Sequence, residues 1–300
     1  MRVGIIGAGS IGLLFAAYIS KVLEVTIYTR TPEQAADITK YGIVLTNRGE
    51  QSIAMVKALS ISDWEGAEDL TIIAVKQYQL QTIIEKINQL PVIPNNLLFL
   101  QNGMGHLKQL ETIPYTNTFV GAVEHGALKE NSYTVRHNGE GTTNVAVIKG
   151  DCRFLSEFVS SVPQEFPLVM KEDYFQMLLN KLIVNAVINP LTAVLQVKNG
   201  ELIKNHHFFH VLKNLFSEIS SILNLENIEE HQQRIIDICK NTSDNRSSML
   251  KDIEADRRTE VDAILGYILD EARIKEIKAP LVENLYYLIK GKEMKKEENS

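Results

Sequence analysis

The sequence has little cysteine and no long uninterrupted apolar stretch. Its two cysteines, Cys152 and Cys239, lie far apart and form neither a CxxC pair nor a zinc-binding spacing, so we predict no metal site. Two isolated thiols are typical of a reducing compartment, where cysteine behaves as a small buried hydrophobe. No window approaches 18 consecutive apolar residues, and the first residues begin a strand. We therefore expect no membrane span, no signal peptide and a cytoplasmic location.

Positive charge is also scarce. The chain has 31 Lys and Arg residues against 37 Asp and Glu residues, for a formal net charge of -6, and it has no basic stripe. We therefore expect no nucleic-acid partner. The length of 300 residues, 45% of them hydrophobic, predicts about two domains that can each bury a core. The sequence leaves the oligomeric state open, with a homodimer as the candidate.

The first half of the chain alternates short apolar runs with helical patterns. Helices are predicted at Ile11–Ser20 and Ile83–Leu90, and strands at Val3–Ile6, Val25–Tyr28, Leu70–Val75 and Leu97–Leu100. This alternation predicts an α/β domain with a parallel, doubly wound sheet. A more β-rich region follows, and we expect it to complete the same sheet as a mixed or antiparallel edge: Phe119–Val123, Tyr133–Arg136 and Thr143–Ile148.

The second half reads as all-helical. Helical periodicity appears at Lys171–Asn189, Phe208–Leu223, Ile228–Cys239 and Glu260–Ile274, while strand-like runs nearly vanish. We place the domain boundary at Phe166-Pro167. The prediction is a first domain over residues 1–166 and a helical second domain over residues 167–300.

A glycine-rich loop follows the first predicted strand. Gly7, Ala8, Gly9, Ser10, Ile11 and Gly12 read GxGxxG, with a helix and a second strand after them, which is the context of a dinucleotide-binding loop. Gly7 would make the tight turn, Gly9 would let the backbone approach a pyrophosphate, and Gly12 would let helix and strand pack closely. The start of the helix would supply N–H groups to the phosphates. The alternative is a glycine-rich turn without a ligand.

The end of the second strand separates the two nicotinamide cofactors. An NAD site places an acidic residue there to bind the ribose 2′-hydroxyl, whereas this sequence has Arg30 and no acid. A guanidinium can donate two charge-assisted hydrogen bonds to a 2′-phosphate. Arg30 therefore favours NADPH, and the alternative is an ordinary surface arginine.

Three polar residues interrupt an apolar helical stretch in the second half. Lys181, Asn185 and Asn189 lie at i, i+4 and i+8, drifting only about 40° per step, so they share one helix face. Burying three polar groups is costly unless they meet a polar ligand or partners, so this stripe is a candidate substrate site. The alternative is that Lys181 reaches solvent while the asparagines bond to neighbouring backbone. Pro190 predicts either a kink or the end of the helix.

Two further candidates are Asn102 and the pair Ser248 and Glu260. Asn102-Gly103 follows a strand, where ligands lie in open α/β sheets, although Asn-Gly is also a common turn pair. On one continuous helix, Ser248 and Glu260 would lie about 18 Å apart along the axis, too far for one small ligand. If both touch one substrate, the chain must break between them, within Lys251–Arg258. Otherwise Glu260 is an ordinary charged helix residue. His125 is a tempting acid, but we interpret it as structural.

Four sequence blocks resemble the ketopantoate reductase family, in the family's order along the chain. They are Gln101-Asn102-Gly103-Met104-Gly105, the KLxxNxxxNPLTA run that begins at Lys181, Asn199-Gly200-Glu201-Leu202, and Ser247-Ser248-Met249-Leu250 followed by Arg258-Thr259-Glu260-Val261-Asp262. With the glycine loop, the resemblance spans the chain from about residue 4 to about residue 290.

The resemblance implies a fold, a reaction and a set of residue roles. The fold would be a Rossmann-type NADP-binding domain followed by a helical substrate-binding domain like the C-terminal domain of 6-phosphogluconate dehydrogenase. The reaction would be reduction of 2-dehydropantoate to (R)-pantoate by NADPH, on the route to pantothenate and coenzyme A. Lys181 would be the catalytic acid. The resemblance implies substrate contacts from Asn102, Asn185, Asn189, Asn199, Ser248 and Glu260, and cofactor contacts from Arg30, Lys76, Asn102 and Glu260 besides the glycine loop.

The residues also support a physical account of this chemistry. Hydride delivery to a ketone creates an alkoxide, to which Lys181 can offer a proton or a fixed positive charge. The Glu260 carboxylate could accept a hydrogen bond from a substrate hydroxyl. Three alternatives stay open: a related NADP-dependent reductase of another small 2-keto acid, another two-domain dehydrogenase, and a catalytically inactive NADPH-sensing protein.

Overall fold

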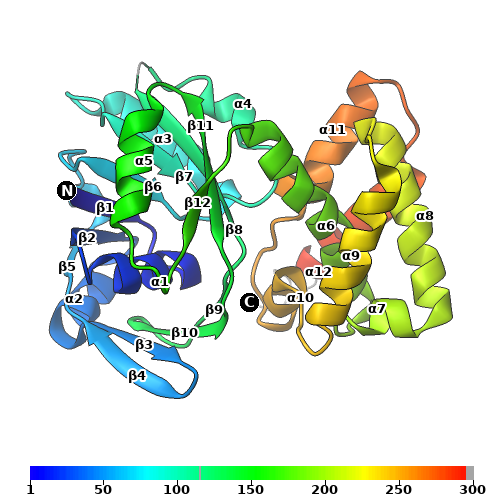
Figure 1. Cartoon of the computed structure of the whole chain (residues 1–300), viewed down its shortest axis with the longest axis horizontal. Coiled ribbons are helices and arrows are strands. Elements are labelled where there is room, and N and C mark those ends of the chain that lie inside the picture. Colours follow the sequence, from blue (N-terminus) through cyan, green and yellow to red (C-terminus); the bar gives the residue numbers. More distant parts are fainter. Residues whose placement is uncertain (115, 295–300) are drawn as a thin grey trace. The chain divides into compact units, whose positions relative to one another are not determined.

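The computed structural model describes residues 1–114 and 116–294 (Figure 1). Residues 115 and 295–300, which fall inside the two predicted domains, lie outside the described residues. Contacts divide the chain into two compact units, Met1–Gln101 with Leu107–Met177 and Asn102–His106 with Leu178–Ser300. The sequence places the boundary at Phe166-Pro167, whereas a short strand, Leu168–Met170, still pairs within the first unit.

The first unit is built on an eight-stranded sheet. Its strand order is β12-β11-β8-β7-β6-β1-β2-β5, and all neighbours run parallel except β8 and β11. This arrangement confirms the predicted parallel sheet with a mixed edge. The strands are β1 (Arg2–Ile6), β2 (Glu24–Thr29), β5 (Lys57–Ser60), β6 (Leu70–Ile73), β7 (Asn96–Phe99), β8 (Asn117–Val123), β11 (Thr143–Lys149) and β12 (Leu168–Met170).

Helix α1 (Ser10–Ile19) is the central helix of this unit. It packs on β1 and β2 on one side and on the strands of a second sheet on the other, and all its residues from Gly12 to Ile19 are buried. A helix that is apolar on every side is stable only when it is enclosed in this way. The remaining helical segments are α2 (Pro32–Tyr41), η1 (Ile61–Asp63), η2 (Gln77–Gln79), α3 (Leu80–Gln89), α4 (Leu107–Leu110) and α5 (Cys152–Ser161).

The second sheet corrects one prediction. Tyr133–Arg136 was expected to complete the main sheet, but β10 (Thr134–Gly139) belongs to a separate four-stranded sheet of order β4-β3-β10-β9 (Figure 1). In that sheet β10 pairs in parallel with β3 (Ile43–Asn47) and antiparallel with β9 (Gly126–Lys129), while β4 (Glu50–Ala54) covers the edge. Alternating side chains predict that a segment is a strand but do not choose its partner. Strand β3, which begins with three apolar residues, and the more polar strand β4 were not predicted.

The second unit is helical, as predicted. Helix α6 runs from Tyr174 to Leu195 and continues through Pro190, so the alternative that it ends there is wrong. By length and composition α6 could span a membrane, but 67% of its most apolar window is buried inside the protein, as in a core helix. The other segments are α7 (Glu201–Lys204), α8 (His206–Leu223), α9 (Ile228–Asn241), α10 (Ser248–Glu254), the π-helical turn η3 (Asp262–Gly266), α11 (Tyr267–Ile274) and α12 (Pro280–Met294).

Two histidines are buried together in the first unit. His125 Nδ1 lies 3.1 Å from His137 Nε2, and Tyr18 Oη lies 2.9 Å from His137 Nδ1. The His125 ring stacks on Phe166 with 4.3 Å between ring centroids. Burial, reinforced by the neighbouring His137, lowers the pKa of His125 to about 4, and burial also lowers the pKa of His137. Both rings are therefore neutral at pH 7, which supports the structural interpretation of His125.

These lowered values predict that acid destabilises the protein. Because the folded-state pKa lies below the unfolded value of about 6.5, the folded chain binds fewer protons than the unfolded chain between these two values. The contribution of the group to stability is therefore complete above about pH 6.5 and is lost as the pH falls toward 4. From pH 7 to pH 5 the free energy of unfolding should fall by on the order of 2 kcal/mol through His125 alone. Urea unfolding across this range measures the slope. We expect His125→Gln to flatten it and His210→Gln, on the exposed face of α8, to leave it unchanged. An unaltered slope in His125→Gln contradicts this explanation.

Candidate functional site

The glycine loop joins β1 to α1 in the geometry that the sequence predicts. Gly7 has a φ of +106°, and a Cβ on Gly12 would overlap the carbonyl oxygen of Gly7. A Cβ on Gly9 would meet nothing within 4 Å, so open space lies beside the loop. Gly9 is the N-cap of α1, and the first turn of α1 contains no acidic residue. This open cradle at a helix N-terminus fits a phosphate group.

Two basic residues follow strands that flank β1 in the sheet. Exposed Arg30 follows β2, and partly buried Lys76 lies shortly after β6, with its backbone N–H directed at Gln79 Oε1 over 3.3 Å. Because β2, β1 and β6 are parallel, both residues and the glycine loop lie at the carboxyl edge of the sheet. Ligands of open α/β sheets bind at this edge.

The Asn102-Gly103 turn belongs to the helical unit, although it follows β7 in the sequence. Asn102 Nδ2 donates a hydrogen bond of 2.9 Å to Glu260 Oε2. Gly103 has a φ of +76°, and a Cβ there would overlap the carbonyl oxygen of Ala263 in the π-helical turn η3. Isolated π-helical turns are frequent at functional sites. The turn therefore packs backbone to backbone on the segment that carries Glu260.

The chain breaks between Ser248 and Glu260, which the sequence analysis required if both residues are to touch one substrate. Helix α10 begins at Ser248 and ends at Glu254, and Asp256 then adopts a left-handed φ of +55°. The Arg257 N–H bonds back to the Asp252 carbonyl at 2.8 Å, which closes the turn. Glu260, only 7% exposed, is therefore on a separate segment from Ser248.

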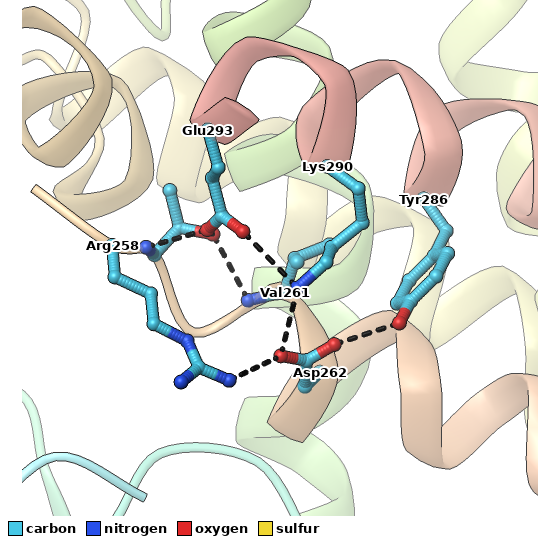
Figure 2. A network of polar contacts seen from close by, with 7 residues as sticks. Arg258, Val261, Asp262, Tyr286, Lys290 and Glu293 are labelled. Atoms are coloured by element: carbon cyan, nitrogen blue, oxygen red, sulfur yellow. Dashed lines mark hydrogen bonds and ion pairs between the residues drawn. The ribbon is translucent and has the colours of Figure 1, made fainter. Parts of the chain in front are cut away.

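A polar network ties the residues on either side of Glu260 to helix α12 (Figure 2). The backbone N–H and the hydroxyl of Thr259 both donate to Glu293 Oε1 over 2.7 Å. Asp262 accepts from Tyr286 at 2.7 Å, from Lys290 at 3.2 Å and from Arg258 at 3.1 Å. Burial works against ionisation of Asp262, but these hydrogen bonds and the lysine charge still lower its pKa. The segment is therefore fixed on both sides of Glu260.

The polar stripe of α6 is present in the structure. Lys181 and Asn185 are partly buried and Asn189 is 6% exposed, among apolar neighbours that are almost fully buried. Asn189 Nδ2 lies 3.5 Å from Ser248 Oγ, so α6 and the start of α10 bring two predicted substrate residues together. The neighbouring residues Thr192, on α6, and Ser247, the N-cap of α10, also meet, with their hydroxyl oxygens 2.7 Å apart. The side chain of Asn189 therefore contacts another side chain and not only neighbouring backbone, and the interpretation of the stripe as a substrate site stays a prediction.

Asn199 lies apart from these contacts. Its side chain donates to Thr242 Oγ1 at 2.9 Å, and its backbone N–H donates to the Asn245 carbonyl at 3.0 Å. Among the residues that the structure describes, its buried Oδ1 has no hydrogen-bond partner. The structure thus holds Asn199 against the loop after α9, and its role as a substrate residue stays a prediction.

His106 was missed by the sequence analysis. It is fully buried, and neither ring nitrogen has a hydrogen-bond partner in residues 1–114 and 116–294. Burial lowers the pKa of His106 to about 4, opposed by the charge of Glu260, so the ring is neutral at pH 7. The one available signal was its position directly after the Asn102–Gly105 block.

Comparisons with known proteins identify the family. A family model described as "Ketopantoate reductase PanE/ApbA" matches residues 3–150, and one described as "Ketopantoate reductase PanE/ApbA C terminal" matches residues 173–293. The 2-dehydropantoate 2-reductase of Bacillus subtilis (strain 168) is 42% identical over 297 residues, which is 98% of each chain. The chain belongs to the ketopantoate reductase family.

Solved structures agree with this family assignment and with the predicted fold. The crystal structure of a probable 2-dehydropantoate 2-reductase from Bacillus subtilis matches with a TM-score of 0.89 and 40% identity, over 97% of this chain and 100% of that one. The ternary structure of D-mandelate dehydrogenase with NADH and anilino(oxo)acetate matches with a TM-score of 0.88, over 98% of both chains. That second similarity shows the fold alone, because the identity is 22%. The ketopantoate reductase resemblance seen in the sequence is confirmed.

The contribution of the backbone contact at Gly103 to stability can be measured by comparing an alanine substitution there with one at Gly49. We expect Gly103→Ala to lower the free energy of unfolding by about 2–4 kcal/mol, because a left-handed φ and an overlap with Ala263 both oppose a Cβ. Gly49 has a similar φ of +86° but open space around it, so Gly49→Ala should cost only about 1 kcal/mol. Urea unfolding measures both. Equal losses in the two variants would show that packing on η3 contributes nothing.

Proposed function

We propose that this chain reduces 2-dehydropantoate to pantoate with NADPH. The observation that carries the proposal is the full-length agreement with a relative named for this reaction, at 42% identity. The pairs Asn102–Glu260 and Asn189–Ser248 support it, because they gather polar groups from distant segments within one helical unit. The assay that tests it follows NADPH oxidation with 2-dehydropantoate and other 2-keto acids, each also with NADH.

In this proposal the two units have separate tasks. The first unit holds the cofactor, with the Gly7–Gly12 cradle at its pyrophosphate, and Arg30 and Lys76 at its negative charges. Open space at Gly9 and a helix N-terminus without acidic residues support this assignment. The preference for NADPH over NADH rests on Arg30, where an NAD site would have an acidic residue. When bound, the reduced cofactor supplies the hydride.

Lys181 has the catalytic role in the second unit. The hydride adds to the carbonyl carbon of the keto acid, and the carbonyl oxygen then takes up a proton to become a hydroxyl. The ammonium of Lys181 stabilises the developing negative charge on that oxygen and donates the proton. Its place in the polar stripe of a largely buried helix supports this role, because apolar surroundings strengthen charge interactions.

The remaining polar residues orient the substrate. Ser248 donates to the substrate carboxylate, with Asn185, Asn189 and Asn199 as further substrate residues. Asn102 contacts both substrate and cofactor, and Glu260 accepts from the substrate hydroxyl besides lying at the cofactor. The hydrogen bond from Asn102 to Glu260 supports this arrangement, since it orients the carboxylate before a ligand binds. A reductase of a different 2-keto acid is the outcome expected if 2-dehydropantoate is not preferred in the assay.

The role of Lys181 predicts a loss in turnover. Lys181→Met removes the proton donor and the positive charge, so kcat should fall by about 10²- to 10⁴-fold. Lys204→Met, which replaces an exposed lysine of the short helix α7, is the matched control and should retain full activity. Stopped-flow and steady-state oxidation of NADPH measure both. Near-normal turnover of 2-dehydropantoate by Lys181→Met would remove Lys181 from the mechanism.

The proposed role of Glu260 as acceptor for the substrate hydroxyl predicts that its removal lowers selectivity for substrates that carry this hydroxyl. Trimethylpyruvate differs from 2-dehydropantoate by a methyl group in place of the hydroxymethyl group, so the ratio of kcat/KM values for the two substrates isolates that contact. We expect Glu260→Ala to lower this ratio by roughly 10- to 100-fold, because a hydrogen bond to a charged acceptor is lost. Glu254→Ala, which removes an exposed partner of Arg246, is the control. If the ratio is the same in wild type and Glu260→Ala, Glu260 does not recognise the hydroxyl.

A further inference from the structure

A second lysine lies against the glycine loop. Lys129 ends strand β9, and its ammonium donates a hydrogen bond of 3.0 Å to the carbonyl oxygen of Ala8. Its backbone N–H donates to Ser10 Oγ, also over 3.0 Å. Gln34 Nε2 shares the Ala8 carbonyl at 2.9 Å and bonds to the Ser132 carbonyl at 2.7 Å. The segment that carries Lys129 is therefore fixed to the loop by several independent contacts.

The surroundings of Lys129 are positively charged. Burial and the nearby charge of Arg30 lower the pKa of Lys129. Within residues 1–114 and 116–294, neither Lys129 nor Arg30 forms an ion pair with a carboxylate, and the ammonium of Lys129 has only the neutral Ala8 carbonyl as its partner. Like charges that have no counter-ion between them repel each other. An anionic ligand at this position would relieve that repulsion.

Ser10 adds a third donor. Its oxygen accepts the Lys129 N–H, so the hydroxyl proton remains available for a ligand. A hydroxyl, an ammonium and a guanidinium are suited to the several oxygens of a phosphate monoester. The position also fits, because Arg30 follows β2, the strand whose end lies at the 2′ position of the cofactor ribose in this fold class.

We propose that Lys129 is a specificity-determining residue, which acts with Arg30 and Ser10 to bind the 2′-phosphate that distinguishes NADPH from NADH. The inference rests on the proposed function for the identity of the cofactor. It does not depend on the keto acid, because every group involved lies in the first unit.

The test uses nucleotide fragments and the full chain without substrate. Adenosine 2′,5′-bisphosphate carries the 2′-phosphate, whereas ADP lacks it, and isothermal titration calorimetry measures the affinity for each. In Lys129→Met the affinity for the bisphosphate should fall by roughly 10- to 100-fold while that for ADP stays the same. Lys129→Arg keeps the charge and should retain most of the affinity. Lys57→Met is the control for loss of an exposed lysine. Lys57 begins strand β5, which pairs with β2, and so lies at the end of the strands opposite to Arg30.

The outcomes separate this inference from the proposed function. Equal losses for both nucleotides would place Lys129 at the pyrophosphate or in loop folding, and no loss would remove it from the site; either result overturns the proposal. In turnover assays, Lys129→Met should reduce kcat/KM for NADPH and leave kcat/KM for NADH unchanged. A wild-type protein that does not reduce 2-dehydropantoate overturns the proposed function alone, since the calorimetric comparison needs no turnover.

Discussion

The contact between the Asn102-Gly103 turn and the Glu260–Ala263 segment is the constraint on which the candidate site of the helical unit depends. A backbone approach that only glycine permits places the turn on η3, and the hydrogen bond from Asn102 then fixes the Glu260 carboxylate. Such a contact between residues far apart in sequence needs support from both sides. On one side, the left-handed φ of Gly103 fixes the direction of the turn. On the other side, the hydrogen bonds of Thr259 and Asp262 to residues of α12 fix the segment that carries Glu260.

The two units present different charged and polar groups. The first unit presents donors and cations around the glycine loop, without an acidic residue in the first turn of α1, as an anionic cofactor requires. The second unit presents a lysine and amides on a helix whose other faces are apolar and buried. Polar groups in such surroundings are costly to bury without partners, and Asn189 meets Ser248 there; the interpretation of the stripe as a substrate site stays a prediction.

Local chemistry made some features predictable from sequence. The roles of Gly7, Gly9 and Gly12 follow from spacing, and the structure shows the turn, the open space and the close packing that they require. A break between Ser248 and Glu260 was expected on the condition that both touch one substrate, which they could not do on one helix, and the structure shows a break after α10. The parallel sheet follows from alternating periodicities.

The features that were missed depend on long-range pairing. Tyr133–Arg136 was recognised as β-like, but only the tertiary structure shows that it pairs with β3, a strand that the sequence analysis did not predict although its first three residues are apolar. Lys129 could not be placed at the glycine loop without that second sheet. The helix through Pro190 shows a local preference overridden by packing, because buried neighbours hold α6 together beyond the proline.

A double-mutant cycle between Asn102 and Glu260 tests the central contact most directly. The kcat/KM for 2-dehydropantoate would be measured in wild type, Asn102→Ala, Glu260→Ala and the double variant, and converted to a coupling free energy. Because the two side chains are bonded at 2.9 Å, we predict a coupling of about 0.5–3 kcal/mol. Strictly additive effects would contradict the account, since the two residues would then act independently.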